Sequence, residues 1–89
     1  MLIKVTQKHI DKSNKLFREA KGFCSRCYNC PIALALQEQV HPDCWNDFYS
    51  IHIPDSAKLH PLPKEACDFV HKYDNGIKVA PFEFDLEGV

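Results

Sequence analysis

Apolar residues recur every three or four positions between Lys64 and Asp74, which predicts an amphipathic helix over that range. Its apolar stripe consists of Ala66, Phe69, Val70 and Tyr73. Gly76 follows it, and glycine tolerates the left-handed conformation in which many helices end. A second helix is predicted to start at Pro31, because proline at the first helical position loses no hydrogen bond. Residues Pro31 to Leu36 are apolar on nearly every side, so we expect the first two turns to be buried.

The N-terminal part of the chain carries weaker helical signals. Thr6 can cap a first turn with its hydroxyl, and Lys15 to Lys21 again shows helical spacing before Gly22. Ser13 and Asn14 lie between these two stretches. Because they break the apolar pattern, the sequence predicts an interruption of the helix there.

Alternation of apolar and polar residues predicts strands at both ends of the chain and one in the middle. These strands are Leu2 to Val5, Phe48 to Ile53 and Lys78 to Leu86, and Ala57 to His60 can return as the second arm of a hairpin. We therefore expect an α+β domain, with two to three helices packed on one face of a small, mainly antiparallel sheet. The terminal strands are expected to pair with each other or with the hairpin.

Length, charge and cysteine usage narrow the class of protein. The 89 residues are expected to form a single compact domain, 1–89. Eleven basic and twelve acidic residues give a near-neutral chain, which argues against a nucleic-acid binder. The first residues predict neither a signal peptide nor a membrane span, so we expect a cytoplasmic protein. Five cysteines, an odd number, are then better explained as metal ligands, reactive thiols or buried apolar residues than as disulfides.

The first chemical hypothesis is a zinc site. Cys24 and Cys27 have the C-x-x-C spacing that lets two thiolates turn around one tetrahedral ion. A second pair, His41 and Cys44, lies at the other end of the helix that starts at Pro31. Zinc held by these four residues would clamp both ends of that helix, although Cys30 is a competing ligand.

The second chemical hypothesis places an anion at the start of the same helix. Backbone N–H groups near Cys30, helped by Arg26 and by Arg18 or Lys21, can hold a phosphate or carboxylate. The helix start would also favour a reactive Cys30 thiolate, which Cys27 could resolve as a disulfide. The plain alternative is that all these cysteines are reduced thiols without a ligand.

For most other residues the sequence favours a structural role. Cys67 lies next to an apolar stripe and is expected to be a small core residue. Histidines 9, 52, 60 and 71 are expected to be ordinary surface or strand residues. Trp45, Phe48 and Tyr49 are either core residues or, if they are exposed together, an interaction patch.

Three stretches carry a resemblance to a known group of proteins: CYNCPIALAL, LPKEACDFVHKYDNG and VAPFEFDL. In these the chain resembles small, mostly uncharacterised bacteriophage and bacterial proteins with a PIALAL helix and a final PFEF-like strand. The resemblance implies a phage-type accessory protein that binds rather than catalyses. We therefore expect a non-enzymatic binder that can form a homo-oligomer. It would inhibit a host protein, or sequester a small anionic or nucleotide signal in evasion of host defence. The alternative is a zinc-stabilised structural module.

Overall fold

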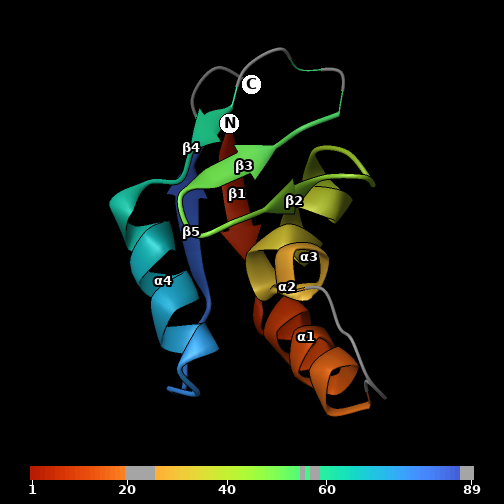
Figure 1. Ribbon diagram of the computed structural model, residues 1–89, viewed down its shortest axis with the longest axis vertical. Coiled ribbons are helices and arrows are strands. Elements are labelled where there is room, and N and C mark those ends of the chain that lie inside the picture. Colours follow the sequence, from red (N-terminus) through yellow and green to blue (C-terminus); the bar gives the residue numbers. More distant parts are fainter. Residues whose placement is uncertain (20–25, 55, 57–58, 87–89) are drawn as a thin grey trace.

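The computed structural model describes residues 1–19, 26–54, 56 and 59–86, and it has the predicted α+β class (Figure 1). The elements in chain order are β1 (Leu2–Val5), α1 (Gln7–Glu19), α2 (Arg26–Asn29), α3 (Pro31–Gln39), β2 (Trp45–Asn46), β3 (Ser50–His52), β4 (His60–Pro61), α4 (Lys64–Asp74) and β5 (Phe82–Asp85). Among these described residues no helix is long and apolar enough to span a membrane.

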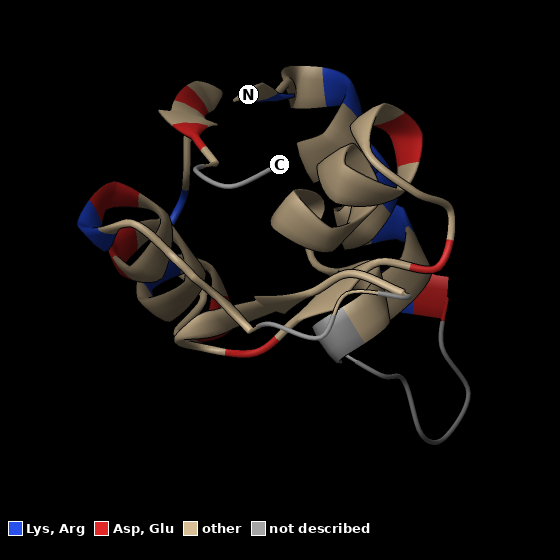
Figure 2. Cartoon of the chain, turned by 90° about the horizontal axis from the view of Figure 1, so that it is seen from above, with Lys and Arg blue, Asp and Glu red and all other residues tan. Residues whose placement is uncertain are grey.

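The strands form two small antiparallel sheets rather than one. The terminal strands β1 and β5 pair with each other, as predicted, and Ile3 lies opposite Phe84 on the buried face. The other sheet has the order β2-β3-β4. Seen from above, the two sheets lie on opposite sides of the core, with α4 at one end and α1 to α3 at the other (Figure 2).

The outer edge of β1 is covered by a side chain. The Lys4 N–H donates to Gln39 Oε1 at 2.9 Å, and Gln39 Nε2 donates to the Lys4 carbonyl at 2.8 Å. The amide of Gln39 therefore bonds both outward-facing backbone groups of Lys4, as a neighbouring strand would. This pair of bonds fixes the end of α3 against the two-stranded sheet of β1 and β5, which we call the terminal ribbon.

Helix α3 lies at the centre of the fold and contacts β1, β2, α1 and α2. It starts at Pro31, as predicted, and every residue from Pro31 to Leu36 is buried. Helix α4 also has its predicted bounds, and Gly76 after it adopts the left-handed conformation at φ 73°. The Phe69 ring of α4 stacks on Phe82 of β5 with centroids 4.7 Å apart, which joins α4 to the terminal ribbon.

The predicted interruption at Ser13 and Asn14 is wrong, because α1 runs unbroken from Gln7 to Glu19. Polar side chains disturb a helix when they bond to its own backbone, whereas these two bond to other parts of the protein. Ser13 is fully buried and its hydroxyl donates to the Asn29 carbonyl at 2.6 Å. The residue is therefore a contact between helices.

The start of α1 differs from the prediction for His9, which is buried rather than at the surface. Its Nδ1 accepts the Thr6 backbone N–H at 3.0 Å, as the glutamate of a capping box would. Nε2 lies 3.4 Å from the exposed Glu38 carboxylate without hydrogen-bond geometry. Thr6 directly precedes α1, but its hydroxyl contacts His9 Nδ1 at 3.0 Å and not the backbone N–H that the sequence predicted.

Several predicted elements are shorter or shifted. The central strand covers Ser50–His52 only, and its return arm is His60–Pro61, with 57 and 58 outside the described residues. The final strand covers Phe82–Asp85. The single helical turn α2 precedes α3, and residues 20–25 lie outside the described part of the chain.

Candidate functional site

Cys30, which belongs to the anion hypothesis and competes as a ligand in the zinc hypothesis, lies in the core with 4% of its surface exposed. Its thiol donates to Asn46 Oδ1 at 3.1 Å, and its sulfur accepts the Ala33 N–H at 3.4 Å. Burial raises the pKa of Cys30 to about 11, and the two hydrogen bonds only partly oppose this effect. The predicted reactive thiolate is therefore wrong, because desolvation outweighs the helix start.

Of the residues proposed for anion binding, the structure describes the side chains of Arg18 and Cys30. Arg18 is exposed in the last turn of α1, whereas Cys30 is buried at the start of α3. Lys21 and the side chain of Arg26 lie outside the described residues. At the start of α3 the Ala33 amide is already bonded to the Cys30 sulfur. The anion site stays a prediction.

Half of the proposed zinc site can be located. Cys44 is fully buried, burial raises the pKa of its thiol, and its backbone N–H donates to the His41 carbonyl at 3.1 Å. His41 Nδ1 accepts the Asp43 N–H at 3.1 Å, which leaves Nε2 as the nitrogen available to a metal. Cys24 and the side chain of Cys27 lie outside the described residues, which themselves contain no group of three or more metal-binding side chains. The zinc site also stays a prediction.

Two aromatic side chains instead form an exposed feature at the turn between β2 and β3. Trp45 pairs with His52, so residues 47 and 50 lie opposite each other and Phe48-Tyr49 is a two-residue loop. Phe48 is 42% exposed and Tyr49 is 68% exposed. We call this pair the aromatic tip. Of the two roles that the sequence left open for these residues, the core role is wrong for both members of the pair.

The aromatic tip is held in place by Asp47. Its Oδ1 accepts the N–H of Tyr49 at 2.8 Å and that of Ser50 at 2.7 Å, and the Tyr49 carbonyl accepts the Leu62 N–H at 2.8 Å. Burial alone would raise the pKa of the Asp47 carboxyl, but the two amides and the nearby His52 ring together hold its pKa below the usual value. The ionised carboxylate therefore fixes the backbone of the turn.

Aromatic contacts with α4 support the tip, and a further stacked pair lies at the base of its hairpin. The Phe48 ring stacks on His71 of α4 with centroids 5.3 Å apart, and Tyr49 meets the same imidazole edge-on at 6.3 Å. At the base of the hairpin the His52 ring lies parallel to Trp45 at 3.6 Å. Phe48 and Tyr49 are thus exposed but supported by neighbouring rings.

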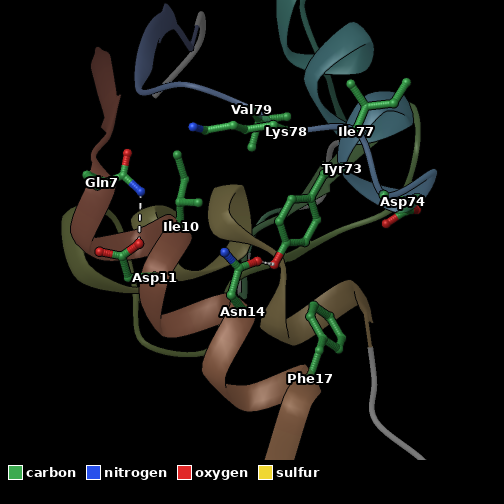
Figure 3. Close-up of a pocket in the computed structure, with 11 residues that line it drawn as sticks. Gln7, Ile10, Asp11, Asn14, Phe17, Tyr73, Asp74, Ile77, Lys78 and Val79 are labelled. Carbon is green, nitrogen blue, oxygen red and sulfur yellow. Dashed lines mark hydrogen bonds between the residues drawn. The ribbon is translucent and has the colours of Figure 1, made fainter.

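A groove with a volume of about 580 Å³ lies elsewhere, between α1 and the segment that connects α4 to β5 (Figure 3). It is lined by Gln7, Ile10, Asp11, Asn14, Phe17, Tyr73, Asp74, Gly76, Ile77, Lys78 and Val79. Its charged lining residues are two carboxylates and one ammonium group. This charge balance does not favour an anion.

A chain of hydroxyl groups joins the two sides of this groove. Tyr73 Oη lies 2.7 Å from Ser13 Oγ and 2.8 Å from the Asn14 side-chain amide, and Ser13 Oγ donates to the Asn29 carbonyl. Since each hydroxyl has one proton, Ser13 donates to Asn29 and Tyr73 donates to Ser13. The Tyr73 proton is shared with a second acceptor, because Asn14 Oδ1 also lies within hydrogen-bond distance of Tyr73 Oη.

Sequence reasoning missed the groove and the role of Ser13, and it left the exposure of the aromatic tip open. One local signal for the tip was present, since aspartate is favoured at the first position of a tight turn. Nothing near Ser13 in the sequence indicates that its partner is Tyr73, which lies 60 positions away. The groove depends on the same long-range contact.

Comparison with known proteins gives no further assignment. No protein-family model, curated protein or solved structure matches the chain. The resemblance to phage-type proteins therefore stays a prediction, and the function has to be argued from the geometry of the described residues.

Proposed function

We propose that this chain is a non-enzymatic binding protein that docks onto a partner protein through the aromatic tip, Phe48 and Tyr49. The observation that carries the proposal is the exposure of these two side chains in a turn that is held rigid by its own hydrogen bonds. The phage-type resemblance makes a host protein in the cytoplasm the partner to test first.

The turn chemistry supports a role beyond chain reversal. Two-residue hairpin loops strongly prefer glycine, asparagine and aspartate, because these residues adopt the required backbone conformations with little strain. Here both positions hold aromatic residues, and Asp47 supplies the hydrogen bonds that keep the turn closed. Departures from local preference of this kind are expected at functional sites.

The rigidity of the turn supports tight docking. A flexible aromatic side chain loses conformational freedom on binding, at a cost of about 0.5–1.5 kcal/mol. Tyr49 has its backbone bonded on both sides and its ring against His71, so part of that ordering is present before binding. Tyrosine is also among the residues that contribute most at protein interfaces. The same features would allow an apolar pocket on the partner to receive the tip.

The experiment compares capture of host proteins by matched variants. The wild-type chain, a Phe48→Ser/Tyr49→Ser double variant and a Leu59→Ser control are immobilised and exposed to bacterial lysate. Leu59 is 65% exposed and does not line the tip's ring contacts, so its substitution removes comparable apolar surface elsewhere. Circular dichroism checks that all three chains are folded.

The expected result is a stoichiometric partner that binds the wild type and the Leu59 variant but not the double variant. A photo-crosslinking residue at position 49 should then react with that partner, whereas one at the exposed position 77 should not. Equal capture by all three chains would contradict docking through the aromatic tip. Saturable binding of a nucleotide, with no protein partner recovered, would replace the proposal with sequestration of an anionic signal.

A further inference from the structure

The groove between α1 and the α4–β5 connection presents hydrogen-bond acceptors in a row. The Gln7 Nε2 donates to Asp11 Oδ1 at 2.8 Å, which leaves Gln7 Oε1 and Asp11 Oδ2 as acceptors (Figure 3). Asn14 Oδ1 accepts the Tyr73 hydroxyl at 2.8 Å and keeps a second lone pair for another donor (Figure 3). We call Gln7 Oε1, Asp11 Oδ2 and Asn14 Oδ1 the acceptor row.

The spacing of the acceptor row follows from the helix. The three residues occupy positions i, i+4 and i+7 of α1, which lie on one face. At about 1.5 Å of rise per residue, successive members are separated by roughly 6 Å and 4.5 Å along the helix axis. All three line the groove. A ligand that fits this wall needs hydrogen-bond donors repeated at a similar interval.

The rest of the groove favours an aliphatic chain and positive charge. Val79 and the small exposed edge of the buried Ile10 supply apolar surface beside the acceptor row, and the tilted rings of Phe17 and Tyr73 meet at 6.2 Å. Aromatic faces attract ammonium groups, and Asp11 provides a carboxylate for one of them. Lys78, which reaches toward α1 in Figure 3, is the single ammonium group among the lining residues.

From these observations we propose that the groove binds a linear organic polyamine, whose ammonium groups donate to the acceptor row while its methylene chain packs on Ile10 and Val79. This site is separate from the aromatic tip. It is also opposite in charge preference to the anion site that the sequence predicted. The exposed Lys78 side chain would turn into solvent when the ligand binds.

The test is a titration of the full-length chain with spermidine at low ionic strength, followed by two-dimensional amide NMR and calorimetry. We expect saturable binding, with the largest shifts in α1 and residues 76–79. Butylamine, which has one ammonium group, should bind at least about tenfold more weakly, because it can satisfy only one member of the row.

Charge variants distinguish the groove from general electrostatic attraction. Asp11→Asn should weaken spermidine binding about five- to tenfold, and Lys78→Ala should tighten it. Glu19→Gln is the matched control, since it removes the same charge from an exposed position on α1 outside the groove. The Glu19→Gln variant should bind spermidine with the same affinity as the wild type.

Three results would overturn the proposal. The first is no saturable binding of spermidine by the wild type. The second is equal weakening by Asp11→Asn and Glu19→Gln, which would mean that only net charge matters. The third is adenosine monophosphate binding at the same residues that is weakened by Lys78→Ala, because this would make the groove an anion site.

Discussion

Replacing Ser13 by alanine tests the hydrogen-bond chain that joins α1 to α4 and to the end of α2. Alanine has the highest helix propensity and would stabilise an ordinary position in α1 by up to about 0.5 kcal/mol. Ser13, however, has no exposed surface and makes two hydrogen bonds, to Asn29 and to Tyr73. The local effect and the tertiary effect therefore have opposite signs.

The magnitude follows from the number of bonds that each variant removes. Ser13→Ala removes both bonds, each contributing about 1 kcal/mol, and leaves a small void, so we expect a loss of about 2 kcal/mol. Tyr73→Phe removes the hydroxyl contacts with Ser13 and with the exposed Asn14 but keeps the ring on Phe17 and Phe69, so we expect about 1–2 kcal/mol. The double variant should cost about 1 kcal/mol less than the sum, because the Ser13–Tyr73 bond is lost only once.

Urea denaturation followed by the fluorescence of Trp45 measures these values. With a slope of about 1 kcal/mol per molar for a chain of this size, the midpoint should fall by about 2 M for Ser13→Ala. Lys12→Ala is the control at an exposed neighbouring position and should change stability by less than about 0.5 kcal/mol. Equal effects of Ser13→Ala and Lys12→Ala, or strict additivity with Tyr73→Phe, would refute the hydrogen-bond chain.

Three further predictions concern other parts of the molecule. Folding lowers the pKa of Asp47, so its carboxylate stabilises the folded state by about 1 kcal/mol or less at this partly exposed site. This contribution is present above the usual pKa of 3.8 and is lost as the pH falls through the lower folded value. In Asp47→Asn, the free energy of unfolding should therefore fall less steeply with pH over this range. Since burial raises the pKa of Cys30 to about 11, iodoacetamide at pH 8 should label this thiol only after unfolding. Peptide mass mapping detects the label, and rapid labelling of the native chain would contradict the burial of Cys30. Phe84→Ala should lower the free energy of unfolding by about 3–5 kcal/mol in the same urea assay, because this β5 ring is buried in the core. A loss below about 1 kcal/mol would show that the terminal ribbon contributes little to the core.

The sequence by itself determined those elements whose signals are local. Helix α4 has its predicted bounds because its apolar stripe and Gly76 lie within a few residues of each other. Helix α3 starts at Pro31 because proline acts on its own backbone. The pairing of β1 with β5 was one of the two alternatives that their alternating patterns allowed. The zinc and anion hypotheses also came from local spacing, and they remain predictions.

Only the tertiary structure decided what each polar or aromatic residue does. Spacing made Cys30 look reactive, but the surrounding core removes it from water, and desolvation then controls its pKa. Phe48 and Tyr49 could have been core residues until the hairpin register placed both in the turn. Ser13 looked like a break in a helix until folding brought Tyr73 to it from 60 positions away. Burial and long-range hydrogen bonds depend on the whole chain, so no local pattern could have specified them.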